Sequence, residues 1–298
     1  MIKHYFLLLR VPNLFTVPSN ILAGYFSVAQ SLSTNLSVLS LLVGSSVLLY
    51  ISGIVFNDYF DIEVDRKERP FRPLPSEKVS KQTAFVAAAI SMVAANGLAF
   101  MVSTLSFSVT IILSVIILGY DYQLKQTVLG PILMGSARTL NVLLGASAIL
   151  PGAISVQKVL PEQRLTILCI SMFLYVLSIT LLSRMEVGPA KPARTVTIPF
   201  VVIFGVIAII IIASSFRVFQ LDIAVSLSLF VGVIVITFKR TIFEGSSTNI
   251  QRAIKTLVLS IIVIDSIFIS GTLGLYYGLT ILLLIIPPIF ISRKLYVT

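Results

Sequence analysis

The sequence predicts an all-α, polytopic membrane protein with about nine to ten transmembrane helices. Hydrophobic residues make up 57% of the 298 positions and charged residues only 11%, and the mean hydropathy is +1.03. Soluble domains carry about 25% charged residues, so this composition excludes a water-soluble enzyme. Long apolar stretches recur from end to end, and basic residues gather between alternate pairs of them.

Each apolar stretch is close to the length of about 20 residues that crosses the hydrocarbon core of a bilayer. The stretches lie at residues 12–31, 39–60, 83–104, 107–121, 129–150, 164–184, 197–214, 220–238, 254–272 and 275–292. Only a short glycine-containing segment around Gly271–Gly274 separates the last two, so nine spans is the alternative to ten.

The basic residues predict the orientation of these spans. With both termini in the cytoplasm, eighteen of the 22 lysines and arginines lie on the cytoplasmic side. Positive charge is enriched on that side of membrane proteins. We therefore expect a multi-pass protein of the cell membrane with cytoplasmic termini. The same distribution explains the net charge of +10 without a nucleic-acid partner.

Two single residues exclude several classes of site. Cys169 is the only cysteine and His4 is the only histidine. A disulfide framework, a zinc site built on Cys or His, and a histidine-dependent triad are therefore excluded. We expect Cys169, within an apolar span, to have a packing role.

Acidic residues concentrate at the predicted cytoplasmic end of the second span. Five of the twelve lie between Asp58 and Glu68. On a helix, Asn57, Asp61 and Asp65 recur at i, i+4 and i+8 and share one face, with Asp58 at its edge. Like charges at this spacing repel one another, so we expect a cation between them.

The type of ligand indicates which cation this is. Oxygen ligands without His or Cys favour a hard divalent ion, Mg²⁺ before Ca²⁺. Mg²⁺ uses one or two carboxylates and completes its shell with water and substrate phosphate, so the substrate is predicted to be a phosphate or diphosphate ester. The alternative is a solvated helix end whose acids pair with Arg66, Lys67 and Arg69.

A proline-rich loop follows the acidic segment. Arg69–Ser76 contains three prolines and the two arginines Arg69 and Arg72. Guanidinium groups bind phosphate in a bidentate manner, and prolines restrict where the side chains point. A positive-inside signal explains the arginines but not the interleaved prolines.

These segments resemble a known family. Asn57–Asp65 with Arg69–Ser76 looks like the first signature of the UbiA-type intramembrane prenyltransferases, and Arg10–Asn13 is similar to the opening of that family's first helix. Glu77 stands where the signature usually has glycine. The resemblance extends to about residue 272.

The resemblance implies a ring of helices around a central cavity that opens to the cytoplasm. It implies a single domain over residues 1–298, with a core at 8–272 and an extra C-terminal helix at 275–292. The implied reaction moves an isoprenyl group from a polyprenyl diphosphate to a small aromatic or lipid acceptor. Mg²⁺ is the implied cofactor and assists ionisation of the diphosphate.

The middle of the chain resembles one branch of this family, the EboC-like branch. The resemblance rests on Tyr120–Lys125, Leu129–Gly135 with Arg138 and Asn141, Leu144–Gly145, and Thr180–Val187.

The chain departs from the family at two places. The family's second acidic motif, DxxxD, binds a second Mg²⁺, but here Glu186 is the only carboxylate and Ala190 stands four residues later. Three alternatives follow: one metal suffices, the second is held by diphosphate and water, or the protein binds polyprenyl phosphates without transferring them. Asp121 stands four residues before Lys125, where the family has a tyrosine.

The motifs and the resemblance together indicate three groups of site residues. The candidate metal ligands are Asn57, Asp58, Asp61, Asp65 and Glu186. The candidate catalytic residues are Asp58, Asp61, Asp65 and Lys125. The candidate diphosphate-binding residues are Asn13, Arg69, Arg72, Tyr122, Lys125, Arg138 and Asn141.

Two positions carry charge inside predicted spans. A charge at membrane depth costs several kcal/mol unless it is paired or faces a wet cavity. We expect Arg138, which shares a helix face with Asn141, to line a polar cavity and to meet phosphate or Asp58 and Asp61. The alternative for Arg138 is a buried ion pair used only in packing. Asp265 is expected to make a structural contact between helices.

Other functional classes remain as alternatives. A carrier or export protein for a lipid-linked metabolite is the main one, because the second acidic motif is incomplete. A CDP-alcohol phosphotransferase needs Gly and Ala-Arg among its aspartates, which Asn57–Asp65 lacks. A secondary transporter would show paired Gly- or Pro-broken half-helices, which the pattern does not contain.

Overall fold

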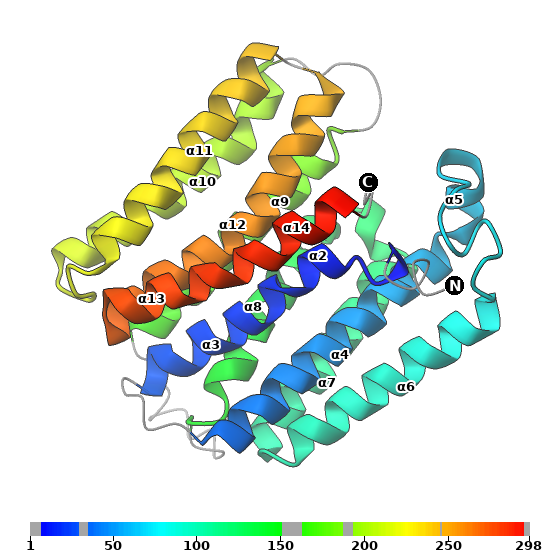
Figure 1. Cartoon of the computed structure of the whole chain (residues 1–298), viewed down its shortest axis with the longest axis horizontal. Helices are drawn as coiled ribbons and strands as arrows, with labels where there is room; N and C mark the ends of the chain where they lie inside the picture. Colours follow the sequence, from blue (N-terminus) through cyan, green and yellow to red (C-terminus); the bar gives the residue numbers. More distant parts are fainter. Residues whose placement is uncertain (1–6, 30–34, 151–162, 187–192, 245, 295–298) are drawn as a thin grey trace.

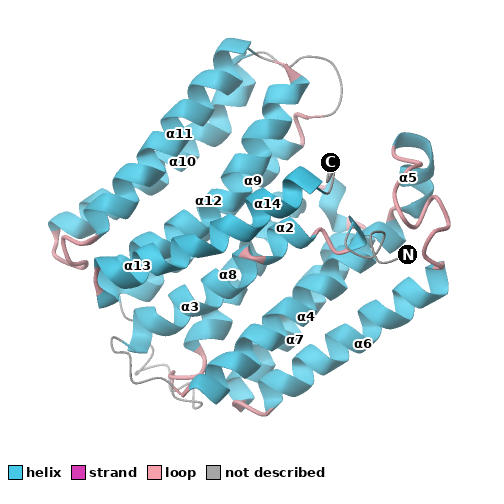
Figure 2. Ribbon diagram, in the orientation of Figure 1, coloured by secondary structure: helices cyan, strands magenta, loops and turns pink. Residues whose placement is uncertain are grey.

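The structure is a computed structural model of the chain, and it describes residues 7–29, 35–150, 163–186, 193–244 and 246–294. The regular elements in these ranges are all helices (Figures 1 and 2). The chain termini lie outside the described residues, and so does Ala190, which stands four residues after Glu186.

Each of the ten predicted stretches contains helix over most of its described residues. The helices are α2 (Val11–Leu14), α3 (Thr16–Ala29), α4 (Leu36–Phe60), α5 (Ile62–Glu68), α6 (Lys81–Phe100), α7 (Thr104–Tyr122), η1 (Leu124–Gln126), α8 (Leu129–Ala146), α9 (Gln163–Ser183), α10 (Ala193–Ser215), α11 (Ile223–Glu244), α12 (Ser247–Leu273), α13 (Leu275–Leu282), η2 (Leu283–Ile285) and α14 (Ile286–Lys294).

Seven of the described helices are long and apolar enough to cross a membrane: α4, α6, α7, α9, α10, α11 and α12. The other predicted spans fall short for physical reasons. The first is divided into the short α2 and the 14-residue α3, α8 carries Arg138 and Asn141 near its middle, and the last is a shorter apolar run. The chain is a multi-pass membrane protein, as predicted.

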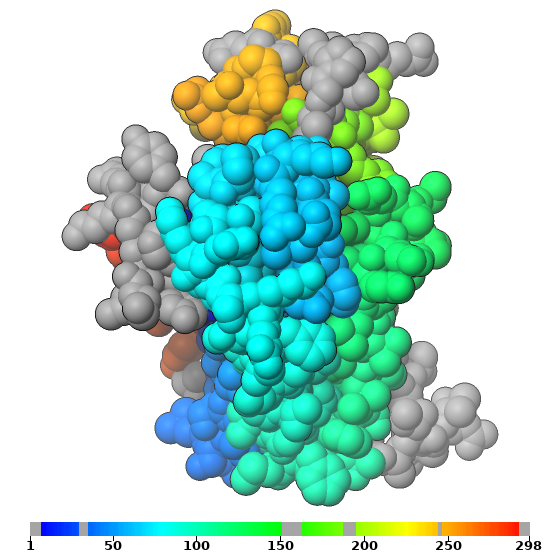
Figure 3. All heavy atoms as spheres, turned by 90° about the vertical axis from the view of Figure 1, so that its right-hand side faces the viewer, coloured from blue at the N-terminus to red at the C-terminus, as the bar shows by residue number. Residues whose placement is uncertain are grey.

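Helices that follow one another in sequence mostly pack side by side, and the last long helix returns to the first. The series runs from α4 through α6, α7, α8, α9, α10 and α11 to α12, and α12 packs against α3. This closes a ring (Figure 1). We call the end of the ring where α4 and α7 end and α8 begins the motif face. In Figure 3 the segment after α4 and helix α6 form one side of the molecule, with α7 beside them.

The acidic segment does not continue one straight helix. Helix α4 ends at Phe60, and Asp61 joins it to α5 with φ −86° and ψ 1°. The amide of Asp61 still donates to the carbonyl of Asn57 at 3.0 Å. The joint therefore bends the chain without breaking the hydrogen-bonded turn.

The end of the chain folds back on α12. Gly274, with φ 104°, separates α12 from α13, a conformation that favours glycine. The hydroxyl of Ser266 then donates to the carbonyl of Gly278 at 2.8 Å. The last two predicted spans are therefore separate helical segments, a long α12 and the shorter apolar run that begins with α13.

Helices α3 and α8 approach each other closely through two glycines. A Cβ atom on Gly24 would collide with the carbonyl of Val142, and one on Gly145 would collide with the carbonyl of Ile21. Small residues allow this approach between membrane helices. The contact fixes one wall of the cavity described below.

This packing leads to a stability prediction. We expect Gly24→Ala and Gly145→Ala each to lower stability by about 1–3 kcal/mol, because the backbones must separate to admit the methyl group. The measurement is the thermal unfolding midpoint in detergent micelles. Gly97→Ala is the control, because a Cβ atom there meets nothing within 4 Å. Equal midpoints for all three variants would contradict the close approach.

Candidate active site at the motif face

Two aspartates of the acidic segment share one arginine. Arg72 Nη1 lies 2.7 Å from Asp65 Oδ2 and 3.4 Å from Asp58 Oδ1. Arg10 Nη2 lies 2.7 Å from the same Asp58 oxygen. Both carboxylates are buried, with 4% of each residue exposed. A guanidinium group therefore occupies the place between carboxylates where a cation was expected.

The other two polar residues of the segment face α7 and η1. Asn57 Nδ2 donates to Asp121 Oδ1 at 3.0 Å, and Lys125 forms an ion pair with Asp61. Asn57 and Asp61 are four residues apart, and so are Asp121 and Lys125. The two contacts thus cross-link the end of α4 to the segment formed by α7 and η1, and they are about one helical turn apart along α4.

The three residues expected on one face take different partners. Asp65 pairs with Arg72, Asn57 donates to Asp121, and Asp61 pairs with Lys125. Asp61 stands at the joint between α4 and α5, where a single regular helix was expected.

The structure does not show the alternative in which these aspartates form a solvated helix end and pair with the basic residues that follow them. Arg66 pairs with Glu63 at 3.1 Å and with Glu77 at 3.8 Å, and all three side chains are largely exposed. Within the described residues, Arg69 makes no ion pair and is half-buried. The aspartates thus take their partners from distant segments.

The proline-rich loop holds Arg72 in place. Leu74 and Val79 anchor the loop in the core with 2% and 3% exposed. The amide of Val79 donates to the carbonyl of Pro73 at 3.2 Å, and the hydroxyl of Ser76 donates to the carbonyl of Arg72 at 2.7 Å. A loop fixed at both sides keeps the guanidinium group against the aspartates.

Arg10 was part of the family-like opening but was not selected as a site residue. It caps α2 with φ 44°, a left-handed conformation that non-glycine residues rarely adopt. Burial lowers the pKa of Arg10, but Asp58, Tyr50 and Asp65 together outweigh that effect, and the pKa is raised above its ordinary value. The strained backbone is held by this ion pair.

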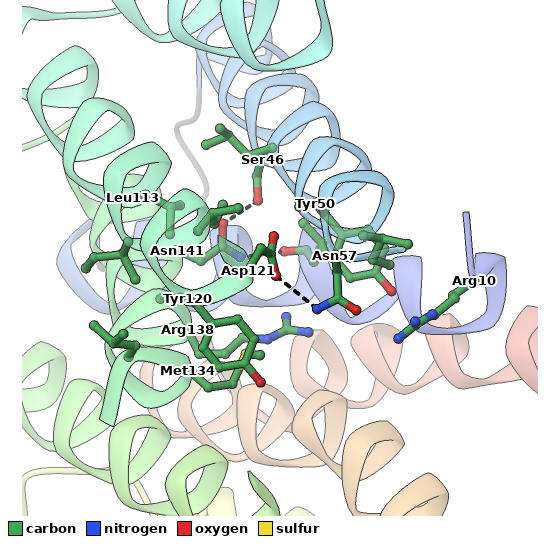
Figure 4. A pocket seen from close by; sticks show the side chains of 18 residues that line it. Arg10, Ser46, Tyr50, Asn57, Leu113, Tyr120, Asp121, Met134, Arg138 and Asn141 are labelled. Carbon is green, nitrogen blue, oxygen red and sulfur yellow. Dashed lines mark hydrogen bonds between the residues drawn. The ribbon is translucent and has the colours of Figure 1, made fainter. Parts of the chain in front are cut away.

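A cavity of about 270 Å³ begins beside this cluster (Figure 4). Its apolar lining includes Leu49, Ile54, Leu113, Ile116, Ile117 and Met134. Its polar lining includes Arg10, Asn57 and Asp121 from the cluster. The cavity thus joins a charged end to apolar walls supplied mainly by α4 and α7.

Arg138 lines this cavity, but it does not contact Asp58 or Asp61 in the structure. Its guanidinium group donates to Asn20 Oδ1 and to the hydroxyl of Thr16, each at 3.1 Å. Asn20 in turn donates to both carboxylate oxygens of Asp265, at 3.0 and 2.8 Å. Asp265 therefore links α12 to α3, the contact between helices expected for it.

Asn141 is a further polar group in the cavity wall. Its side-chain oxygen accepts a hydrogen bond from Ser46, and its nitrogen donates to the carbonyl of Val17 at 3.4 Å. Ser46 was not selected from the sequence, because a single polar residue in an apolar span carries no pattern.

Of the two tyrosines around Asp121, it is Tyr120 that lines the cavity. Tyr122, the predicted diphosphate ligand, is 63% exposed and stacks edge-on against Phe60 with ring centroids 5.5 Å apart. Figure 4 shows the Tyr120 ring beside Asp121. The prediction chose the neighbour that faces outward.

Glu186 and Asn13 form their hydrogen bonds with residues other than the aspartates of the acidic segment. Glu186 Oε1 accepts from Gln251 Nε2 of α12 at 2.9 Å. The backbone amide of Asn13 donates to Arg10 at 2.9 Å and its carbonyl accepts from the Thr16 hydroxyl at 2.8 Å. Within the described residues, neither side chain contacts Asp58, Asp61 or Asp65.

The donor set fits Mg²⁺, although the described residues hold no cluster of three His, Cys or acidic groups close enough to bind an ion alone. Mg²⁺ commonly binds one or two carboxylates and takes its other ligands from water and substrate phosphate. The acidic end of the cavity offers such carboxylates, and one buried oxygen there, Asp121 Oδ2, has no hydrogen-bond partner.

Comparison with proteins of known sequence gives partial matches to one named enzyme. The chain is 35% identical to digeranylgeranylglyceryl phosphate synthase of Methanoculleus marisnigri over 106 residues, 36% of this chain and 37% of the relative. It is 23% identical to the protein of that name from Sulfurisphaera tokodaii over 161 residues, 54% and 58% of the two chains. The matches span less than two thirds of either relative.

Solved structures show the same fold. The apo structure of a UbiA homologue from Aeropyrum pernix aligns with a TM-score of 0.70 and 17% identity, covering 88% of this chain and 98% of that one. A UbiA homologue from Archaeoglobus fulgidus bound to GPP and Mg²⁺ aligns with a TM-score of 0.65 and 15% identity, covering 94% and 99%. The sequence profile of the UbiA prenyltransferase family matches residues 17–297, and the chain belongs to this family.

Proposed function

We propose that the protein transfers an isoprenyl group from a polyprenyl diphosphate to a small aromatic or lipid acceptor by Mg²⁺-assisted ionisation of the diphosphate. One observation carries the proposal: three aspartates, each paired with a cation, lie at the end of α4, and one of those cations, Arg10, also lines a cavity with apolar walls. The pairs are Asp58 with Arg10, Asp65 with Arg72 and Asp61 with Lys125.

The two ends of the cavity match the two parts of an isoprenyl diphosphate. The apolar walls of α4 and α7, including Leu49, Ile54 and Ile117, would hold the hydrocarbon chain. Burying that chain stabilises binding by about 25 cal/mol per Å² of apolar surface. The basic side chains at the charged end would bind the diphosphate oxygens.

Asn57, Asp58, Asp61 and Asp65 are the residues proposed to hold Mg²⁺. When bound, this ion neutralises negative charge that develops on the leaving diphosphate. Arg10, Arg72 and Lys125 stabilise the same charge by donating hydrogen bonds from fixed positions. The bond from carbon to the diphosphate oxygen breaks with both electrons on the diphosphate. An electron pair of the acceptor then forms the new bond to the allylic cation, and the acceptor loses a proton to the released diphosphate.

This reaction requires no covalent nucleophile on the protein. It does require exclusion of water from the cation, and the helix ring provides an apolar enclosure for it. Arg138 and Asn141 form a second polar area of the cavity wall. We propose that they bind the diphosphate or the polar group of the acceptor.

The comparisons support a lipid acceptor within this proposal. The relatives are named as digeranylgeranylglyceryl phosphate synthases, and an isoprenyl lipid phosphate is a product of the proposed chemistry. The closer placement in the EboC-like branch remains a proposal that rests on stretches such as Tyr120–Lys125.

The proposed topology follows the basic residues. Both termini lie in the cytoplasm, the motif face is cytoplasmic, and the protein resides in the cell membrane. The chain forms one domain over residues 1–298, with α13 and α14 as an addition to a core at 8–272. Protease accessibility of epitope-tagged termini in sealed vesicles tests this orientation.

A second function has one observation in its favour. Glu186, the remaining acid of the second motif region, contacts Gln251 and not the aspartates. A protein with an incomplete metal site could bind or export polyprenyl diphosphates without cleaving them. This alternative predicts binding without release of diphosphate.

The first test is diphosphate release from farnesyl and geranylgeranyl diphosphate, with and without Mg²⁺ and with a cell-lipid extract as acceptor pool. We expect Mg²⁺-dependent release that falls about 100-fold or more in Asp61→Asn, because the variant loses a metal ligand and leaves Lys125 unpaired. Glu63→Gln is the matched control, since Glu63 pairs only with the exposed Arg66. Tight binding with no release by the wild type would support the carrier alternative.

The second test concerns the bridging guanidinium group. Arg72→Gln leaves Asp65 without its cation, and we expect KM for the prenyl diphosphate to rise about ten- to hundredfold, since a hydrogen bond to a charged group contributes about 1.5–3 kcal/mol. Arg72→Lys keeps the positive charge but not the paired N–H donors of the guanidinium group, so we expect its KM to lie between those of the wild type and Arg72→Gln. Arg66→Gln, at the exposed surface, is the control. An unchanged KM in Arg72→Gln would remove Arg72 from the site.

A further inference from the structure

Asp121 is a buried carboxylate with one oxygen unsatisfied. It lies in the last turn of α7, 4% exposed, and lines the cavity (Figure 4). Its Oδ1 accepts from Asn57 Nδ2 at 3.0 Å, whereas its Oδ2 has no hydrogen-bond partner. A buried polar oxygen left without a hydrogen-bond partner is costly, so such a group in a cavity indicates a missing cation or donor.

The surroundings of Asp121 supply further oxygen ligands. The bond to Asp121 uses the amide nitrogen of Asn57 and leaves its carbonyl oxygen for another contact. Asp61 follows Asn57 by one helical turn, about 6 Å along the axis, and pairs with Lys125. Two carboxylates and one amide oxygen thus lie at the neighbouring ends of α4 and α7.

The end of α9 does not offer an equivalent carboxylate. Glu186 is held by Gln251, and its backbone carbonyl accepts from Ser247 at 3.0 Å. Arg184, two residues earlier, turns toward the η1 loop and donates to the carbonyls of Lys125 and Thr127. The segment where a second metal-binding acid was expected therefore presents an arginine to the η1 loop instead.

We propose that Asp121, with Asn57 and Asp61, ligates a divalent cation of the Mg²⁺ type, in place of the acid missing from the second motif. The proposal rests on the proposed function, because the remaining ligands are water and a substrate diphosphate. Oxygen ligands of this kind suit Mg²⁺ and Mn²⁺. Asp121 then acts as a metal ligand contributed by α7, and Glu186 is not a metal ligand.

The test is Mn²⁺ binding, followed by electron paramagnetic resonance, to the purified full-length protein with a non-ionisable prenyl thiolodiphosphate. We expect Asp121→Asn to bind Mn²⁺ at least tenfold more weakly than the wild type. Glu186→Gln and the surface control Glu63→Gln should bind as the wild type does. Wild-type affinity in Asp121→Asn, or a loss in Glu186→Gln alone, would overturn the assignment.

A second measurement on the unaltered chain avoids any effect of substitution on folding. Fe²⁺ in the Mg²⁺ site, with ascorbate and peroxide, cleaves the backbone near the metal, and mass spectrometry locates the cuts. We expect cuts close to Asp121 and Asp61. Cuts near Glu186 and none near Asp121 would overturn the proposal.

The outcomes separate this inference from the proposed function. If the wild type binds no Mn²⁺ even with the thiolodiphosphate present, both are contradicted. If the wild type binds Mn²⁺ and Asp121→Asn binds it equally well, only the role of Asp121 is contradicted. Asp121→Asn retains an oxygen that can accept from Asn57, and an unchanged unfolding midpoint shows that the variant is folded.

Discussion

The ion pairs at the end of α4 are the constraint on which the site depends. Asp58, Asp61 and Asp65 take their cations from three separate segments: the residue before α2, the proline-rich loop and η1. An unpaired buried charge costs several kcal/mol, so these segments must converge on the acidic helix end. The same basic side chains can change partner from a carboxylate to the diphosphate when substrate enters.

A second polar system shapes the interior of the ring. Hydrogen bonds run from Arg138 through Asn20 to Asp265 and connect α8, α3 and α12. Because Asn20 lies between the two charges, Arg138 is stabilised by Asp265 and still faces the cavity. The close glycine packing of α3 on α8 holds this wall in position. A charge at membrane depth is thereby kept both stable and available.

The helices could be predicted from the sequence because hydrophobic length is a local property. The acidic segment at the end of α4 and the loop carrying Arg72 were likewise visible as motifs. The partners of each aspartate were not, since they depend on how distant segments meet. The joint at Asp61 between α4 and α5 was not predicted either, because no residue pattern signals it.

The remaining misses have a common cause. Tyr122 and Glu186 were selected by position relative to a family pattern, and the structure turns both away from the aspartates. Asp121 was noted only as a departure from that pattern. A buried acid four residues before a lysine, at the end of an apolar helix, is a signal in its own right. The cost of burying its charge is what makes it informative.

The most direct test of this account is a crystal structure of the protein with Mg²⁺ and a prenyl thiolodiphosphate. The account predicts that the diphosphate lies at the charged end of the cavity, between Arg72 and Lys125. Lys125 should then have turned from Asp61 to a diphosphate oxygen. A diphosphate bound outside the cavity, with the pair of Lys125 and Asp61 intact, would contradict the account.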